Sequence, residues 1–332
     1  MTVPAGTGTT YTFSTPPSNI IREDLEDYVY KISPLETPGM QSVGRKGKFK
    51  NTLHEWPVVE LAAANANNAK IEGDDTPNDA PTTALRLANY TQIMTKTKGV
   101  SSTDEAVTGA GDIQKLAKQV LYGTQEIKRD MEARLMGSPA LVAVPGAAGT
   151  TARQTAAIAA FLQTNVSFGA TGAPAFRSGS PAAVGGGGYP VTPGVPGTVR
   201  PLTETIFKQV IQAAWTQGGN PKYAFVSGTQ KTLISTFTGN ATRFKKAEDR
   251  RLIAAIDVYE SDFGQLQIVP DRFIDPGTIL ILDPGYAEIG WLMGMKNEPL
   301  AKTGLSMRRL VSCEWGTIVG NEKAHAMVAA VA

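Results

Sequence analysis

The sequence has few of the side chains that build metal sites and disulfides, with one cysteine and two histidines in 332 residues. The lone Cys313 cannot form an intramolecular disulfide, which suits a reducing compartment or one where disulfides are irrelevant. A buried strand position is its simplest assignment. With only His54 and His325, the chain has almost none of the side chains needed for a zinc site or a histidine-based catalytic triad. A catalytic centre of carboxylates or lysines is not excluded, but no spacing indicates one, so we expect no cofactor and no metal.

An excess of charge of one sign and long hydrophobic runs are also absent. The 32 basic and 30 acidic residues give a net charge of +2, far from the basic excess of proteins whose main task is to grip nucleic acid. Residues 1–19 have neither the basic start nor the apolar stretch of a secretory signal. No window is long and apolar enough for a membrane span. We therefore expect synthesis in the cytosol, no membrane contact and no primary role in DNA binding. The 42% of hydrophobic residues suffice for one large or two ordinary domains.

The stretch from Gly39 to Lys46 partly resembles a phosphate-binding loop. That loop reads G-x-x-x-x-G-K-[ST] and lies between a buried strand and a helix, so that backbone N–H groups converge on the anion. Here Arg45 stands in place of the lysine, and no Ser or Thr follows Lys46. We favour a basic turn leading into a hairpin. A nucleotide-dependent enzyme that uses Gly44-Arg45-Lys46 stays open as an alternative of a different class.

Two alternating segments, 52–61 and 83–97, predict the arms of a long β-hairpin. The connection between them, residues 62–81, is too long and too polar for a tight turn. Its acids are Glu72, Asp74, Asp75 and Asp79. An EF-hand calcium loop would also need a glycine and a final glutamate at fixed positions, and both are missing. A solvated or partner-facing tip is the preferred interpretation.

Apolar spacing predicts helices over 22–32, 112–136, 151–165 and 203–217. The helix over 112–136 would be about 37 Å long at about 1.5 Å per residue, which makes it a structural spine. Short strands with turns between them follow up to residue 283, and 305–331 reads as two strands joined at Gly320-Asn321 that return to the spine. The glycine- and proline-rich tract 169–201, with four consecutive glycines at 185–188, predicts a flexible surface loop.

This order of elements resembles the α+β fold of the major capsid proteins of tailed bacteriophages, which also occurs in herpesvirus shells and encapsulins. The segments that carry the resemblance are DLEDYVYKISPLETP, NTLHEW, AWTQGGNPKYAFVSGTQK, AIDVYESDFGQLQIVPDRF, ILDPGYAEIGWL, EPLAKTGLSMRRLVSCEW and NEKAHA. Together they span nearly the whole chain. The resemblance implies the following segments: an N-terminal arm (1–21), a short helix and basic turn of the peripheral domain (22–51), an extended β-hairpin loop (52–98), the peripheral domain with its spine helix (99–168), a Gly/Pro-rich insertion (169–201), an axial domain (202–285), and C-terminal strands returning to the peripheral domain (286–332).

The function implied by the resemblance is structural. Many copies would form hexamers and pentamers of an icosahedral phage head around double-stranded DNA, in the virion and, during assembly, in the host cytoplasm. The hairpin would lie over a neighbouring subunit, and the family has no catalytic residues to transfer. The candidate inter-subunit contacts are Arg45, Lys46, Lys48, Lys50, Trp56, Lys70, Glu72, Asp74, Asp75 and Asp79. The simpler interpretation of these charges is a solvated surface, because exposed ion pairs stabilise little.

Partners follow from the same resemblance. Only about twenty residues precede the first expected helix, so we expect a separate scaffolding protein. We also expect a portal protein at one vertex and non-specific contact with packaged DNA. A decoration protein is an optional further partner. Some relatives cross-link through a lysine and an asparagine, but no partner or activating acid is identifiable for Lys70, so we predict no cross-link. The rival within the same fold is the shell of an encapsulin-like nanocompartment.

Overall fold

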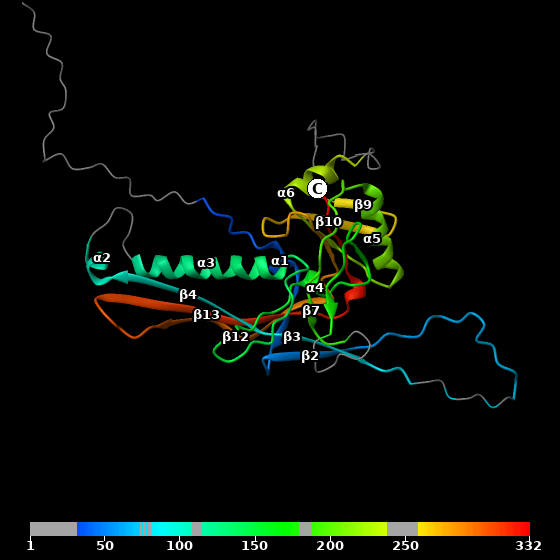
Figure 1. Ribbon diagram of the computed structural model, residues 1–332, viewed down its shortest axis with the longest axis horizontal. Coiled ribbons are helices and arrows are strands. Elements are labelled where there is room, and N and C mark those ends of the chain that lie inside the picture. Colours follow the sequence, from blue (N-terminus) through cyan, green and yellow to red (C-terminus); the bar gives the residue numbers. More distant parts are fainter. Residues whose placement is uncertain are drawn as a thin grey trace, which may run out of the picture.

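The computed structural model describes residues 32–73, 75, 78, 81–107, 115–178, 187–237 and 258–332. These residues form two units, and the chain passes between them more than once (Figure 1). The elongated unit is a four-stranded sheet with a long helix beside it. The second unit, here called the six-stranded unit, consists of a six-stranded sheet and two shorter helices. The predicted α+β class is confirmed.

The elongated unit is built on a long antiparallel hairpin of β12 and β13, with β4 on the far edge of β13 and β1 parallel to β12. Its strands are β1 (Gly44–Lys48), β12 (Ala287–Pro299), β13 (Ser306–Val319) and β4 (Gln92–Ser101), in that spatial order, and the short helix α2 (Ser102–Ala106) follows β4. The predicted buried strand position of Cys313 is confirmed, because this residue lies in β13 with no exposed surface.

Helix α3 (Lys115–Leu135) runs along this sheet and makes contact with β4 and β13 (Figure 1). Ile127, Met131 and Leu135 are fully buried, because residues four apart lie on one helix face. The helix predicted over 112–136 is therefore confirmed for its described part. Its first three residues lie outside the described ranges.

The six-stranded unit has the strand order β5-β14-β11-β8-β10-β9. Its strands are β5 (Val166–Ser167), β14 (Ala326–Val328), β11 (Ile279–Leu282), β8 (Tyr223–Val226), β10 (Gly264–Pro270) and β9 (Val258–Ser261). Helix α5 (Glu204–Thr216) packs on β14, and α6 (Gly228–Ser235) packs on β10. The prediction of a helix over 203–217 is confirmed, with Phe207, Val210 and Ile211 buried as its spacing indicated.

Strands β2 (Leu53–Val58) and β3 (Leu85–Tyr90) pair antiparallel as the base of the predicted hairpin. The second arm does not continue beyond β3 as one strand of that hairpin, because β4 pairs with β13 instead. The break lies at Thr91, whose N–H donates to the Thr52 carbonyl (2.8 Å) and whose hydroxyl donates to Glu314 (2.6 Å). The prediction of one long two-stranded hairpin over 52–61 and 83–97 is therefore wrong. The longer C-terminal strand β13 is the partner of β4, and sequence spacing does not reveal this pairing.

The helix predicted over 151–165 is also wrong for most of its length. Only α4 (Ile158–Phe161) is helical. Gln154 bridges Val144 in antiparallel fashion, and the Ala157 N–H donates to the Leu141 carbonyl. This alanine-rich run is buried in an extended form because its backbone finds partners elsewhere in the subunit.

The tract 169–201 lies largely at the surface, as predicted, since most of its described residues are exposed or half-buried, but parts of it pack on the subunit. It contains the ribbon of β6 (Phe176–Arg177) and β7 (Pro190–Thr192). Residues 187–190 are buried, and Gly188 exchanges backbone hydrogen bonds with Arg86 and Ala88 beside β3. Residues 179–186 lie outside the described ranges.

Two of the predicted segments contribute strands to both units. In segment 286–332, β12 and β13 do return to the long helix, whereas β14 inserts into the six-stranded sheet. In segment 99–168, β5 joins the same sheet and pairs with β14. Assigning these two strands to the unit of the spine helix is therefore wrong. The helix predicted over 22–32 falls outside the described residues except for Ile32.

Candidate functional site

The basic segment near residue 45 is a strand rather than a turn. Gly44 and Arg45 pair with Glu288 and Ile289 of β12, and Lys48 pairs with Trp291. A phosphate-binding loop needs free N–H groups at the start of a helix, and a strand that leads into a further turn and strand does not supply them. The nucleotide-loop interpretation therefore fails for Gly44-Arg45-Lys46.

The cationic side chains of this segment are available to a partner. Arg45, Lys46, Lys48 and Lys50 are all exposed. Lys46 lies 3.7 Å from Glu288 in a pair that is half open to solvent, so this contact contributes little. Arg45, Lys46 and Lys48 lie in β1 at the free edge of the four-stranded sheet, and Lys50 follows just after that strand. Their role as inter-subunit contacts stays a prediction.

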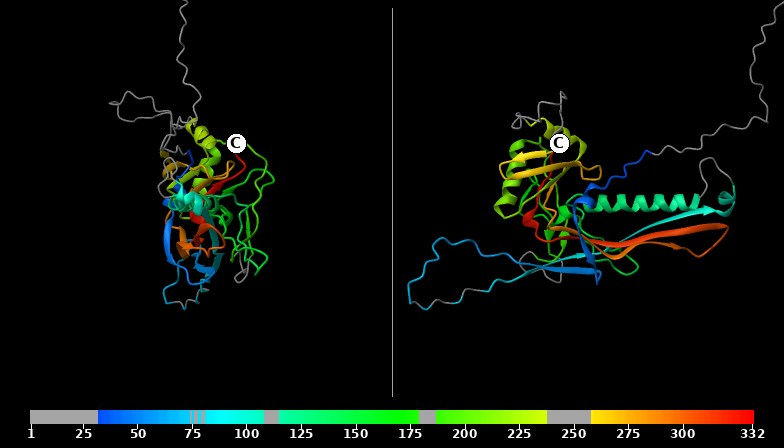
Figure 2. Two further views of the ribbon diagram at one scale, coloured as in Figure 1. Left: turned by 90° about the vertical axis from the view of Figure 1, so that its left-hand side faces the viewer. Right: turned by 180° about the vertical axis from the view of Figure 1, so that it is seen from behind.

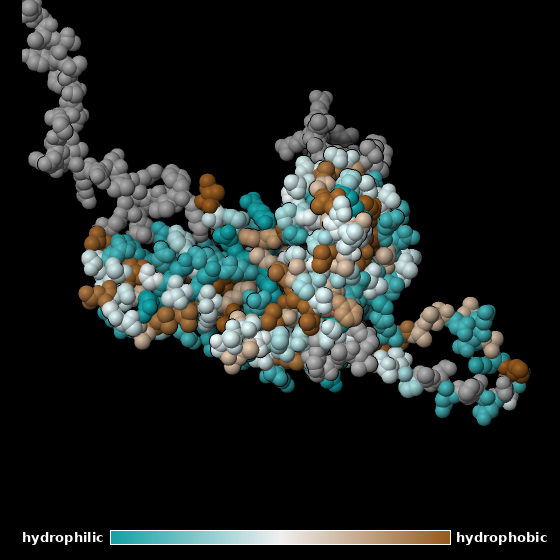
Figure 3. Space-filling model, viewed as in Figure 1, coloured by the Kyte–Doolittle hydropathy of each residue, from teal (hydrophilic) through white to brown (hydrophobic). Residues whose placement is uncertain are grey.

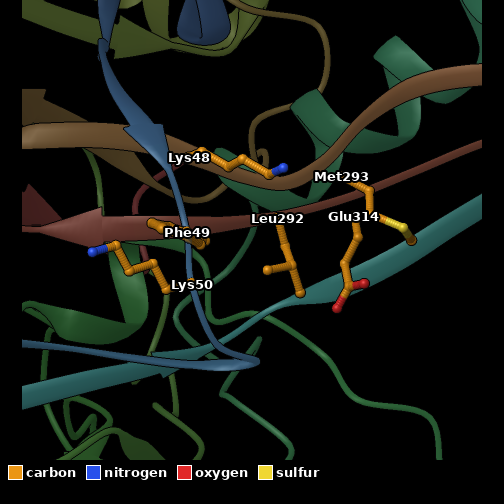
Figure 4. Close-up of a pocket in the computed structure, with 6 residues that line it drawn as sticks. All are labelled: Lys48, Phe49, Lys50, Leu292, Met293 and Glu314. Atoms are coloured by element: carbon orange, nitrogen blue, oxygen red, sulfur yellow. The ribbon is translucent and has the colours of Figure 1, made fainter.

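Beside this edge lies a cavity of about 620 Å³, lined by Lys48, Phe49, Lys50, Leu292, Met293 and Glu314 (Figure 4). Leu292 and Met293 from β12 supply apolar surface, and Lys48 and Lys50 supply positive charge. The Glu314 carboxylate is already bonded within the chain, because it accepts from Thr91 (2.6 Å) and from Arg153 (2.7 Å). The cavity, here called the basic groove, is therefore apolar with a cationic rim.

Phe49 forms one wall of the basic groove and is itself anchored. Its ring is buried at 4% exposure and stacks on His54, with ring centroids 4.4 Å apart. The ring fits over two glycines, Gly290 and Gly316, where added Cβ atoms would lie 2.1 Å and 3.0 Å from it. Burial and the Lys46 charge lower the pKa of His54, so this stack favours the neutral imidazole.

Trp56 is not a surface residue, although the sequence suggested it as an inter-subunit contact. Its side chain is 6% exposed, its indole N–H donates to the Val319 carbonyl (2.9 Å), and it packs near Phe161. A tryptophan in a strand fits either a buried position or an exposed contact with another subunit, and the sequence alone could not distinguish the two. Here it ties β2 to the end of β13.

The loop beyond β2 and β3 extends away from the rest of the subunit (Figures 1 and 2). Every residue from 59 to 73 is exposed, including Lys70 and Glu72, and Asp75 is exposed too. Asp74 and Asp79 lie outside the described residues. The loop also exposes apolar side chains, with Leu61 at 88% and Ile71 at 77%. Figure 3 shows hydrophobic surface among the hydrophilic residues of this loop.

Within one chain the structure does not bring this acidic loop to the basic groove. Among the described residues no group of acids, histidines or cysteines could hold a metal ion, and no helix there is long and apolar enough to cross a membrane. The groove residues Leu292, Met293 and Glu314 were missed by sequence reasoning. No local signal marks them, because strand pairing across more than 200 residues brings them to β1.

Comparison with known proteins identifies the family. The family model of the SU10 major capsid protein matches residues 5–332. The chain belongs to this family. The major capsid protein of Escherichia phage Phieco32 is 29% identical over 114 residues, which is 34% of this chain and 32% of that protein. That alignment therefore spans about a third of the curated relative.

Solved structures show that this SU10-family chain has the tailed-phage capsid (HK97-like) fold. The capsid protein of cyanophage A-1(L) superimposes with a TM-score of 0.64 at 12% identity, covering 95% of this chain and 98% of that one. The capsid of cyanophage P-SCSP1u gives a TM-score of 0.60 at 10% identity, covering 100% and 99%. The resemblance inferred from the sequence is confirmed, and with it a structural component of the virion capsid. Membership of a structural family also argues against an enzyme.

Proposed function

We propose that this chain assembles into the hexamers and pentamers of an icosahedral head that encloses double-stranded DNA. The observation that carries the proposal, beside family membership, is the loop at residues 59–73, in which every residue is exposed. The base of the hairpin is anchored in the core by Trp56 and Leu87, but an extended segment that buries as little surface as the loop does is not stable alone in water. Resting on a neighbouring copy would bury it, and such head-to-tail contacts close into rings.

We infer that the loop docks at the basic groove of the neighbouring subunit. Ile71 offers an apolar side chain for the surface of Leu292 and Met293. Glu72 and Asp75 offer negative charge for Lys48 and Lys50. Exposed ion pairs contribute about 0–1 kcal/mol each, so apolar burial supplies most of the affinity and the charges fix the register. This arrangement uses both clusters that the sequence singled out.

The test is assembly of the purified full-length chain, followed by sedimentation and negative-stain electron microscopy. Reversing the groove charges (Lys48→Glu with Lys50→Glu) or the loop charges (Glu72→Lys with Asp75→Lys) should shift material from shells or rings to small species. Combining all four changes should restore assembly in part. The matched control, Lys222→Glu with Lys302→Glu, changes exposed lysines far from the groove by the same amount.

The outcomes separate the two claims. Monomers under every condition, including co-expression with a candidate scaffolding protein, would contradict the shell function. Normal assembly of both charge-reversed pairs would contradict the docking site and leave the shell function standing.

The partners are part of the same proposal. We infer a separate scaffolding protein that sets curvature, a portal at one vertex, and only non-specific contact with DNA, which suits a wall of net charge +2. A decoration protein is compatible with the fold, since a solved structure of phage G contains gp27 major capsid proteins with gp26 decoration proteins, at a TM-score of 0.53 and 9% identity. Shells that close only with the scaffolding protein present would support its role.

A further inference from the structure

A buried glutamate of the long helix holds the segment through which the N-terminal part of the chain enters the fold. Helix α1 (Pro38–Ser42) receives no cap from the side chain of Thr37. Instead, Glu132 of α3 accepts from the Gly39 N–H (2.5 Å) and from the Met40 N–H (2.9 Å), one bond to each carboxylate oxygen. Glu132 has no exposed surface.

The two helices pack closely at Gly39. A Cβ on Gly39 would lie 2.6 Å from the Met136 side chain and 2.8 Å from the Glu132 carboxylate. A larger residue at position 39 would therefore require the Met136 and Glu132 side chains to move. The contact is specific in geometry as well as in charge.

A second buried acid meets Glu132 from the six-stranded unit. Asp271, directly after β10, is 2% exposed, and its Oδ1 accepts from the Phe273 N–H (2.9 Å). Its Oδ2 is buried and has no partner unless the facing Glu132 carries a proton. Burial first, and then the Asp271 charge, raise the pKa of Glu132 to about 7 against the two backbone N–H bonds, and burial also raises the pKa of Asp271.

The other charged side chains on the neighbouring elements do not act on this pair in the same way. Asp271 is the one charged side chain among the described residues that contributes to the raised pKa of Glu132. Arg129, one turn earlier on α3, is directed at the Phe273 ring, 5.7 Å from its centroid. The sequence of α1, PGMQS, has no ionisable side chain. Of the other charged side chains of α3 near Glu132, Asp130 and Glu126 pair with Lys96 and Lys98 of β4. Arg134 donates to the Thr155 and Val142 carbonyls, and Lys128 lines a cavity with Arg45. Arg272 directly follows Asp271.

We propose that Glu132 and Asp271 form a proton-dependent latch that joins α1, the long helix and the six-stranded unit. With one proton between them, both carboxyl groups are satisfied and the three elements stay together. Without it, two carboxylates are buried in contact, which is unfavourable through both desolvation and repulsion. Opening separates α1 or the Asp271 loop from α3, so the latch controls how firmly α1 is attached to α3.

The direction of the pH effect follows from proton linkage. The closed state binds the proton more tightly than the open state, in which the carboxyl groups regain ordinary pKa values. Closure is therefore most favourable below about pH 4.5, weakens through the interval up to about pH 7, and changes little above it. One linked proton makes the opening constant rise about tenfold per pH unit within that interval.

The experiment is amide hydrogen exchange of the full-length chain between pH 5 and pH 8.5, corrected for intrinsic exchange rates, for peptides covering residues 33–42. The protection of Gly39 and Met40 should fall about fortyfold between pH 5 and pH 7 and then level off. In Asp271→Asn, which keeps the bond from Phe273 and can donate to Glu132, this fall should be less than tenfold. The control Asp262→Asn, at an exposed turn, should behave as the wild type does.

A second variant keeps the test decisive if Asp271→Asn folds poorly. Glu132→Gln has one acceptor oxygen and no charge, so it should show lower protection at pH 5 and no pH dependence. The latch is refuted if wild-type protection does not change with pH, or if Glu132→Gln retains the full wild-type response, since another group would then be titrating.

Discussion

The anchoring of Phe49 over Gly290 allows a sharp test of the packing beside the basic groove. Truncation of a buried phenylalanine to alanine costs about 3–5 kcal/mol. Because one side of the ring borders the open groove, we expect Phe49→Ala to cost about 3 kcal/mol, near the lower end. For a chain of this size that corresponds to a fall in Tm of roughly 4 °C. Gly290→Ala should cost about 1–3 kcal/mol by overpacking, since its Cβ would lie 2.1 Å from the ring.

The double variant distinguishes this explanation from general disturbance of β12. With the ring removed, the added methyl group has space and the strand loses one of its two glycines, so Gly290→Ala should be neutral or stabilising in the Phe49→Ala background. The expected coupling is about 1–3 kcal/mol, measured by urea unfolding of the unassembled chain. Gly294→Ala, where nothing lies within 4 Å of the added Cβ, serves as a control and should change stability by less than about 0.5 kcal/mol. Additive effects of the two substitutions would refute the packing argument.

Three further predictions concern buried polar groups. Burial lowers the pKa of His325 to about 4, so the stability that depends on its neutral imidazole is full above about pH 6.5 and is lost as the pH falls to about 4. Over that window the wild type should lose up to roughly 3 kcal/mol more stability than His325→Asn, measured by urea unfolding. Equal losses would contradict a lowered pKa of His325. Arg177→Met should cost about 3 kcal/mol in the same assay, because it leaves the Glu322 carboxylate, 2.9 Å away, buried without its cation, whereas exposed Arg272→Met should cost less than about 0.5 kcal/mol. Trp56→Phe removes the 2.9 Å bond to the Val319 carbonyl and should cost about 1–3 kcal/mol, and a neutral result would show that water replaces the indole N–H.

Elements whose cause is local could be predicted from the sequence. Helix α5 begins at Thr203, whose side chain accepts from the Ile206 N–H, and its buried positions follow the helical period. The buried stripe of α3 was visible for the same reason. The basic cluster at residues 45–50 and the exposed polar loop were also predictable, because charge and glycine content are properties of short segments.

Elements whose cause is distant could not be predicted. The alanine-rich run near residue 156 has strong helix propensity, yet the Asn89 side chain accepts from the Ala156 N–H, and Thr155 binds both Asn89 and the Thr317 N–H. These partners lie 66 or more residues away. The break at Thr91 and the two sides of the basic groove depend on the same kind of long-range pairing, which leaves no periodic trace.

The position of β14 has a consequence for how the subunit is made. This strand lies inside the six-stranded sheet, between β5 and β11, although it is the last strand along the described chain. During synthesis the sheet therefore has an open gap until residues 326–328 have left the ribosome, and β5 has no neighbour before then. A nascent subunit therefore cannot complete this sheet, or present its finished surface to other copies, before β14 has been translated.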